Sequence, residues 1–102
     1  MREFSSGAHR DSAEGKGRYD LIPPEAIRAL AKRFEDGGKH YGDNNWKKGL
    51  PNYCLFDSAL RHLFSALEGK TEEDHLGACL WNVSVLIYNR EHGLGENISE
   101  NN

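Results

Sequence analysis

The sequence predicts an all-α fold, a small bundle of three main helices between two disordered ends. Apolar residues recur at spacings of three and four in three segments, which is the pattern of helices with one buried face. Glycines and prolines separate these segments, as expected for turns between helices. No alternating apolar run is long enough to predict a strand. The punctuating residues are Pro23, Pro24, Gly37, Gly38, Gly69 and Gly93.

The two ends of the chain have the composition of disordered tails. Residues 1–14 are rich in serine, glycine and charge and contain almost nothing apolar, and residues 94–102 are similar. The single domain is therefore expected over residues 15–93. Its first four residues are Gly15-Lys16-Gly17-Arg18, two cations on flexible glycines. They are either the end of the tail or an arm that folds over an anion.

The first helix is predicted to begin at Pro23 or Pro24, because proline fits the first helical turn, where its missing N–H would have no partner. Gly37-Gly38 is expected to end or weaken this helix. The apolar stripe comprises Ile27, Leu30, Ala31 and Phe34.

Residues 39–53 are predicted to form a loop, because five of them are typical turn residues. The loop nevertheless carries two aromatic residues, Tyr41 and Trp46. These rings either pin the loop to the core or form the wall of a binding site, and one ring can do both.

The second helix is predicted over about residues 51–68 and the third over about residues 71–92. The hydroxyl of Thr71 is expected to cap the third helix, with Glu72, Glu73 and Asp74 in its first turn, where the helix dipole favours negative charge. The third helix is apolar around most of its circumference, which is typical of a central helix or an oligomer interface. We expect a partner subunit to complete the bundle, giving a homo-oligomer, most simply a dimer.

Composition excludes several classes of protein. The chain has 102 residues and a net charge of −3, which argues against general nucleic-acid binding. It has no apolar run of the length that spans a membrane, and its N-terminus does not resemble a signal peptide. The two cysteines, Cys54 and Cys79, lie in apolar helical pattern and are interpreted as buried, reduced thiols. A cytoplasmic protein is therefore expected.

Polar residues interrupt the apolar surfaces of the second and third helices. On the third helix His75, Asn82 and Asn89 recur every seven residues and so share one face. On the second helix Asp57 and Arg61 are four residues apart, as are Ser58 and His62. Burying an unpartnered polar side chain costs about 1–3 kcal/mol, so these residues need partners. They either line a shared cleft that receives a ligand or, as Asp57–Arg61 could do, form ordinary ion pairs.

Familiar catalytic motifs are lacking, since the sequence contains no phosphate-binding P-loop and no zinc motif. The adjacent carboxylates Glu72, Glu73 and Asp74 could hold Mg²⁺, which takes oxygen ligands. They are equally well explained as charges at the start of a helix.

Four blocks occur in order: "GKGRYDLIPPEAIRALA", "GGKHYGDNNWKKG", "LRHLFSALEG" and "HLGACLWN". Together they resemble the phage-encoded dATP/dGTP diphosphohydrolase N-terminal family, over residues 15–88. Proteins given this activity are similar in role to the all-α MazG-like pyrophosphohydrolases. The resemblance implies Mg²⁺-dependent hydrolysis of a purine deoxynucleoside triphosphate between its α and β phosphates.

The resemblance also implies roles for individual residues. The nucleotide would be held by Lys16, Arg18, Tyr41, Asn45, Trp46, Arg61 and Asn82. The catalytic residues would be His62 and His75. Mg²⁺ would be held among Asp57, Glu68, Glu72, Glu73 and Asp74. In this scheme the cations cover the polyphosphate, an aromatic ring stacks on the purine, and Asn82 reads a base edge or the ribose.

The chain departs from the family pattern in three ways. The connection before His75 is short, Ala78 stands where a second histidine is common, and the acidic metal boxes of MazG-like enzymes are not present as such. Three hypotheses therefore stay open. The protein hydrolyses the nucleotide, or captures it without cutting it, or uses its polar stripes only to set oligomer register.

Overall fold

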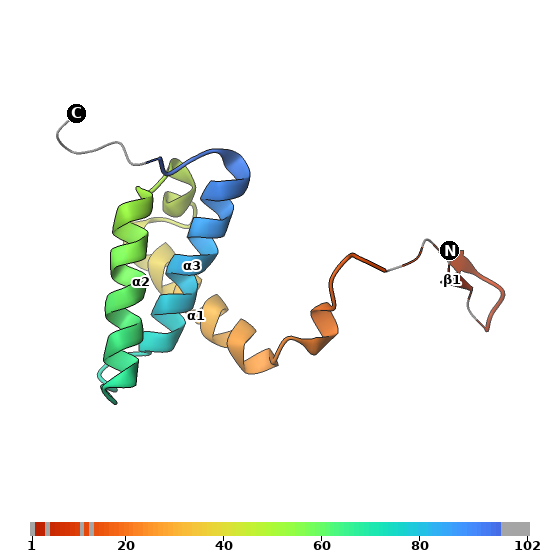
Figure 1. The fold of residues 1–102 in the computed structure, drawn as a ribbon, viewed down its shortest axis with the longest axis horizontal. Helices are drawn as coiled ribbons and strands as arrows, with labels where there is room; N and C mark the ends of the chain where they lie inside the picture. Colours follow the sequence, from red (N-terminus) through yellow and green to blue (C-terminus); the bar gives the residue numbers. More distant parts are fainter. Residues whose placement is uncertain (1, 4, 11, 13, 97–102) are drawn as a thin grey trace.

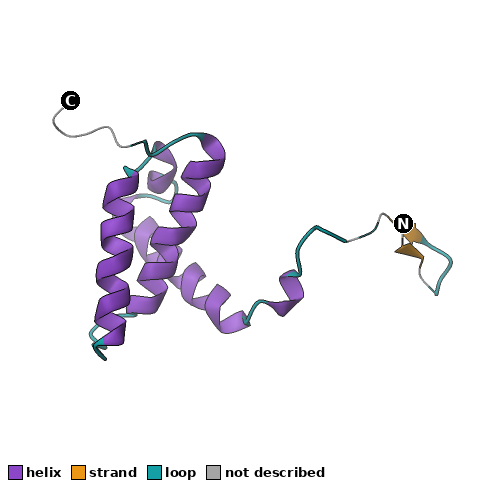
Figure 2. Ribbon diagram, in the orientation of Figure 1, coloured by secondary structure: helices purple, strands orange, loops and turns teal. Residues whose placement is uncertain are grey.

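The computed structural model describes residues 2–3, 5–10, 12 and 14–96, and most of them are helical (Figures 1 and 2). The three α-helices are α1 (Pro24–Tyr41), α2 (Asn52–Leu67) and α3 (His75–His92). Two short 3₁₀ turns, Tyr19–Leu21 and Asn45–Lys48, precede α1 and α2. The all-α prediction is confirmed.

The central element is α3, which packs against both α2 and α1. Figure 1 shows α2 and α3 side by side and antiparallel, with α1 crossing them. The buried apolar residues are Leu55 and Ala59 of α2 and Ala78 and Val85 of α3. Of the two explanations for the apolar circumference of α3, the central position is therefore confirmed, and an interface with another chain stays a prediction.

Aromatic rings attach α1 and the following loop to α3. The ring of Phe34 lies 5.5 Å from that of Trp46 and 5.8 Å from that of Trp81, centroid to centroid. The Trp46 ring also meets Tyr88 edge to face at 4.8 Å. Such pairs add about 0.5–1.5 kcal/mol each beyond the burial of their surface. Trp46 therefore has the pinning role that the sequence left open.

The first helix does not end at Gly37-Gly38, as predicted, but continues to Tyr41. Glycine inside a helix costs about 1 kcal/mol relative to alanine, and here it makes room for the returning chain. A Cβ on Gly38 would lie 2.5 Å from Oδ1 of Asp43. The helix ends instead at Gly42, whose φ is 92° and whose N–H donates to the carbonyl of Gly38 at 3.0 Å.

The second helix lies within one residue of its predicted bounds, but the third begins at His75 and not at Thr71. Its cap is Asp74, whose Oδ1 accepts the N–H of Gly77 at 3.0 Å. The prediction that Thr71 is the cap, with three acidic residues in the first turn, is wrong. Glu72 and Glu73 belong to the connection before the helix, where the side chain of Glu72 bonds His75 of α3 and that of Glu73 bonds Arg33 of α1.

The ends of the described chain differ from each other. Arg2–Glu3 (β1) and His9–Arg10 (β2) form a two-residue antiparallel pair that the sequence did not predict, and this segment extends away from the helices (Figure 1). At the other end, the N–H of Asn52 donates to the carbonyl of Gly95 at 2.8 Å. The chain just after residue 93 therefore contacts the start of α2. The predicted tails fall partly on residues 1, 4, 11, 13 and 97–102, which lie outside the described residues.

Two expectations about burial are wrong for the single chain. Both cysteines are free, but Cys54 is exposed and Cys79 is only half-buried. The apolar face predicted for the second helix is largely uncovered, because the covered side of α2 carries Leu55, Ser58, Ala59 and His62 instead. The exposed apolar residues of α2 are Tyr53, Phe56, Leu60, Leu63, Phe64 and Leu67. Among the described residues, no helix combines the length and apolar character needed to cross a membrane.

Candidate functional site

A polar seam runs along the contact between α2 and α3. Asn82 donates from Nδ2 to the hydroxyl of Ser58 at 3.2 Å and to the carbonyl of Ala78 at 2.8 Å. Two helical turns further along α3, Asn89 donates from Nδ2 to the carbonyl of Leu50 and to Oδ1 of Asn52, at 2.9 and 3.0 Å. The prediction that polar stripes on the two helices face each other is thus confirmed. These two asparagines, however, are partnered by the protein itself.

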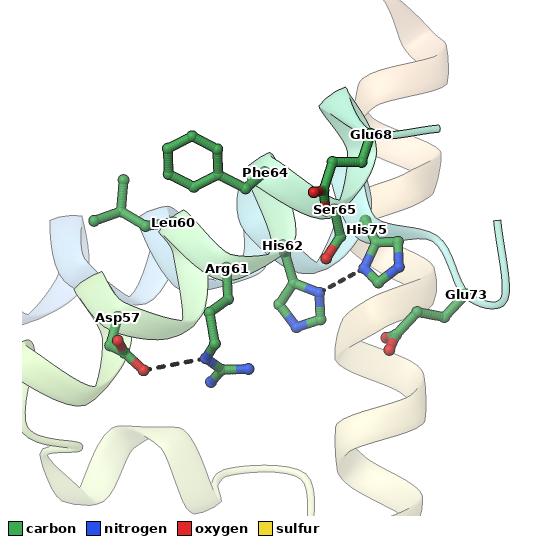
Figure 3. A pocket seen from close by; sticks show the side chains of 9 residues that line it. All are labelled: Asp57, Leu60, Arg61, His62, Phe64, Ser65, Glu68, Glu73 and His75. Carbon is green, nitrogen blue, oxygen red and sulfur yellow. Dashed lines mark hydrogen bonds and ion pairs between the residues drawn. The ribbon is translucent and has the colours of Figure 1, made fainter. Parts of the chain in front are cut away.

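The third member of the seam, His75, forms a chain of contacts with His62 and Glu72. The two Nδ1 atoms of His62 and His75 lie 2.9 Å apart (Figure 3), and Nε2 of His75 lies 2.6 Å from Oε1 of Glu72. A carboxylate only accepts, so Nε2 of His75 carries a hydrogen. In neutral His75 the Nδ1 atom is then an acceptor, which receives the Nδ1–H of His62.

Burial, nearby charges and hydrogen bonds lower the pKa values of His62 and Glu72. Burial is the main cause that lowers the pKa of His62; Arg33, His75 and Arg61 lower it further, and Glu73 opposes them. The pKa of Glu72 is lowered by hydrogen bonding to its own backbone amide and to His75. His62 is therefore an uncharged imidazole at pH 7, with a lone pair available for a proton or a metal ion.

Two open pockets meet at His62. The first, which we call the His75 pocket, has a volume of about 530 Å³ (Figure 3). Its polar lining comprises Asp57, Arg61, His62, Ser65, Glu68, Glu73 and His75. The second, the Asn82 pocket, has a volume of about 390 Å³. Its lining comprises Arg33, Asp36, Gly37, His40, Tyr41, Ser58, His62, Trp81 and Asn82.

Each pocket contains a guanidinium group that is paired with a carboxylate. Arg33 on α1 donates to Oε1 of Glu73 at 3.0 Å, forty residues away in the chain. Arg61 donates to Oδ2 of Asp57 at 3.1 Å, within α2. Both pairs are at least partly solvated, so each is worth little to stability and an anion can compete for the guanidinium.

Several predicted site residues are brought together by the fold. Tyr41 and Asn82 lie in one pocket, Arg61 and His75 lie in the other, and His62 belongs to both. Tyr41 is 74% exposed, so its ring is available for stacking, whereas Asn82 is 6% exposed and forms part of the floor.

Other predicted nucleotide-binding residues lie elsewhere. Lys16 and Arg18 lie on the segment before α1, and Arg18 pairs with Asp20 at 2.7 Å. Asn45 and Trp46 line only a small hollow of about 30 Å³. None of these four residues lines the His75 or the Asn82 pocket.

The five acidic residues predicted to hold Mg²⁺ do not form one ligand set in the described structure. Glu72 bonds His75, Asp74 caps α3, and Glu68 pairs with Lys70 at 3.4 Å. Asp57 pairs with Arg61. Over the described residues, the one group of three metal-ligating side chains with converging donor atoms is His62, Glu73 and His75.

Sequence reasoning missed Arg33, Asp36 and His40, which α1 contributes to the Asn82 pocket. The apolar stripe of α1 indicated which face of this helix packs on the core. It gave no sign that the polar residues beside the stripe reach a pocket shared with α2 and α3. The continuation of α1 past Gly38 is what carries His40 and Tyr41 to the pocket.

The comparisons with known proteins give one result. The family model described as "dATP/dGTP diphosphohydrolase, N-terminal" matches residues 6–98. No curated protein and no solved structure matches the chain.

Proposed function

The chain belongs to the dATP/dGTP diphosphohydrolase N-terminal family, and we propose that it binds a purine deoxynucleoside triphosphate across the two pockets and hydrolyses it to monophosphate and pyrophosphate. The observation that supports this proposal is the position of His62, which lines both pockets. One pocket has the aromatic and amide groups that suit a nucleoside, and both pockets have a guanidinium that suits phosphate, Arg33 in the Asn82 pocket and Arg61 in the His75 pocket.

The nucleoside is assigned to the Asn82 pocket. Tyr41 provides an exposed ring for stacking on a purine. Both Nδ2 hydrogens of Asn82 are already donated to Ser58 and Ala78. In this pose only the carbonyl oxygen of Asn82 remains to accept a hydrogen bond from a base or ribose.

The phosphates are assigned to the His75 pocket and to the neighbouring Arg33. Guanidinium groups bind phosphate oxygens with charge-assisted hydrogen bonds, and they stabilise the charge that develops during phosphoryl transfer. Phosphate would replace the carboxylate of Asp57 as the partner of Arg61, and that of Glu73 as the partner of Arg33. His62 and His75 are the proposed catalytic residues, since they face the same pocket as Arg61.

The family resemblance implies Mg²⁺, but the residues that converge do not suit this ion. Mg²⁺ prefers an octahedron of oxygen ligands, whereas the described group offers two imidazole nitrogens and one carboxylate. No step of the proposal uses Mg²⁺.

The basic arm remains part of the proposal, as a segment that covers the phosphates only when nucleotide is bound. Lys16→Ala combined with Arg18→Ala should weaken triphosphate binding much more than nucleoside binding. Two charge-assisted contacts of about 1.5–3 kcal/mol each correspond to a loss of about a hundredfold or more. Calorimetric titration checks this, and a melt that stays unchanged separates lost binding from lost folding.

A second candidate, capture of a nucleotide without hydrolysis, is favoured by the scattered acidic residues. Incubation with each of the four dNTPs and a panel of divalent metals, followed by chromatography, distinguishes the two. Monophosphate plus pyrophosphate supports hydrolysis. Intact nucleotide that is released only by heat denaturation supports capture, and absence of both contradicts the proposal.

Matched variants test the assignment of the pockets. Tyr41→Ala should weaken nucleoside binding, and Tyr53→Ala is its control because Tyr53 is also exposed but lines neither pocket. Arg61→Gln should weaken triphosphate binding, with Arg28→Gln on the exposed surface of α1 as control. Equal effects within either pair would contradict the assignment.

The setting of this activity is proposed from the resemblance alone. It is nucleotide-pool metabolism of a phage in the host cytoplasm. The protein is also proposed to act as a homo-oligomer, because the third helix is apolar around most of its circumference. The uncovered apolar groove between α2 and α3, about 530 Å³ in volume, supports the oligomer. A second α2–α3 pair packed on this face would complete a four-helix bundle.

A further inference from the structure

We infer that His62, Glu73 and His75 form a binding site for a divalent transition-metal ion, of the class that includes Zn²⁺, Co²⁺ and Ni²⁺. One ligand atom from each residue lies within 4.8 Å of the other two. Two imidazoles and a carboxylate are a donor set that these ions accept readily. The inference concerns these three side chains and does not depend on the proposed function.

The separation of the two histidines fits a shared metal ion. Imidazole nitrogens lie about 2.0–2.1 Å from Zn²⁺. Two such nitrogens are then about 2.9 Å apart at a right angle and about 3.3 Å apart at the tetrahedral angle. The observed Nδ1–Nδ1 distance of 2.9 Å therefore needs an opening of a few tenths of an ångström at most. The proton that joins the two rings in the metal-free form must leave His62 Nδ1, for example to Nε2 of the same ring.

Glu73 can complete the ligand set by a movement of its own side chain. At the tetrahedral angle its oxygen would lie about 3.3 Å from each nitrogen, so a separation of up to 4.8 Å closes with a shift of about 1.5 Å, which side-chain rotation can supply. Glu73 lies in the connection between α2 and α3, and its side chain is 41% exposed. Its Oε1 is held by Arg33, which leaves Oε2 to turn toward the histidines.

The surrounding groups resemble the outer shell of a metal centre. His75 is buried and directs Nε2 at Glu72, at 2.6 Å, and a carboxylate behind a metal-binding histidine fixes its tautomer and raises its basicity. Arg33 plays the corresponding part for Glu73. All three residues line the His75 pocket, and three protein ligands would leave the fourth position of a tetrahedral ion for water or a substrate oxygen.

The alternative is that the two histidines only hydrogen bond, as Asn82 and Ser58 do further along the seam. Titration of the chelator-treated protein with Zn²⁺ alone, in the absence of nucleotide, separates the two. We expect one equivalent to bind. In nitrogen-15 spectra the Nδ1 signals of His62 and His75 should shift, and so should Nε2 of His62, which gains the proton, whereas Nε2 of His75 keeps its hydrogen toward Glu72 and should change little. A structural hydrogen bond predicts no such shift on addition of Zn²⁺, and that result would overturn the inference.

Variants test the ligands one at a time. His62→Gln and Glu73→Gln should each weaken Zn²⁺ binding by at least a hundredfold, and Glu72→Gln by about ten- to a hundredfold, the range found for outer-shell partners. His92→Gln is the matched control, because His92 is an exposed histidine of α3 that stacks on Tyr88. Circular dichroism checks that each variant is folded. Unchanged Zn²⁺ affinity in folded His62→Gln would overturn the site, whatever the outcome with nucleotides.

Discussion

Asn89 should contribute more to folding than any surface polar residue of this chain, although its side chain is an amide. It is fully buried. Its Nδ2 ties the end of α3 to the segment that starts α2, through Leu50 and Asn52. Asn89→Ala removes two hydrogen bonds of about 0.5–1.5 kcal/mol each and leaves two oxygens without this donor. The buried Oδ1 of Asn89 has no hydrogen-bond partner among the described residues, so its removal offsets part of this cost. We therefore expect a loss of about 1–3 kcal/mol in the free energy of unfolding.

For a domain of this size, 1 kcal/mol corresponds to about 4–8 °C in Tm, so Asn89→Ala should lower Tm by at least about 4 °C. Urea unfolding followed by circular dichroism measures the free energy directly. Asn89→Asp sharpens the test, because it keeps the shape but directs a carboxylate at two acceptor oxygens. This variant should be at least as unstable as Asn89→Ala at pH 7 and should recover part of its stability when the acid is protonated.

Asn45→Ala serves as the control, since Asn45 lies in the 3₁₀ turn and is only half-buried. It should change stability by less than about 0.5 kcal/mol, as is usual for residues outside the core. A change of less than about 0.5 kcal/mol for Asn89→Ala would refute the reasoning, because it would mean that the hydrogen bonds of Asn89 add nothing to the stability of the fold.

Three further predictions follow from the same contacts. Gly95→Ala should destabilise the protein more than Gly93→Ala in thermal melts; both glycines have positive φ, but only at Gly95 would a Cβ collide with the Asn52 and Asn89 side chains, and equal losses would contradict this. Burial lowers the pKa of His62 in the folded protein below its ordinary value of 6.5, so below that pH the unfolded chain binds more protons than the folded one. The contribution of His62 to stability is therefore complete above about pH 6.5 and is lost as the pH falls through the lowered pKa. In chelator, urea unfolding of His62→Gln should show a flatter pH dependence there than wild type or His92→Gln, and an unchanged slope would argue against it. Sedimentation should find an oligomer at micromolar concentration, and Leu63→Glu in the α2–α3 groove should shift it toward monomer, whereas a monomeric wild type would refute the interface.

Local sequence determined the number and approximate position of the helices. The 3.6-residue repeat of apolar side chains and the glycines and prolines between the segments depend on near neighbours, so they can be read without the fold. The same is true of the heptad spacing of His75, Asn82 and Asn89, which correctly placed them on one face of α3. The order of the four sequence blocks was also enough to indicate the family.

Where local signals compete, the sequence could not choose between them. Thr71 and Asp74 are both acceptable helix caps. In the structure Asp74 is the cap, and the helix that starts at His75 directs its first side chain at His62. Gly37-Gly38 reads as a helix end, but packing against the returning Asp43 keeps these residues helical.

The identity of each contact was decided only by tertiary structure. Nothing in the sequence links Arg33 to Glu73, forty residues away, or shows that Glu72 and Glu73 serve different partners, His75 and Arg33. The chain determined that polar groups would be buried along α3, since their spacing put them on its packed face. Which atom forms a hydrogen bond with each of these groups depends on how α1 and α2 are oriented against that face. This orientation is set by the packing of the whole bundle.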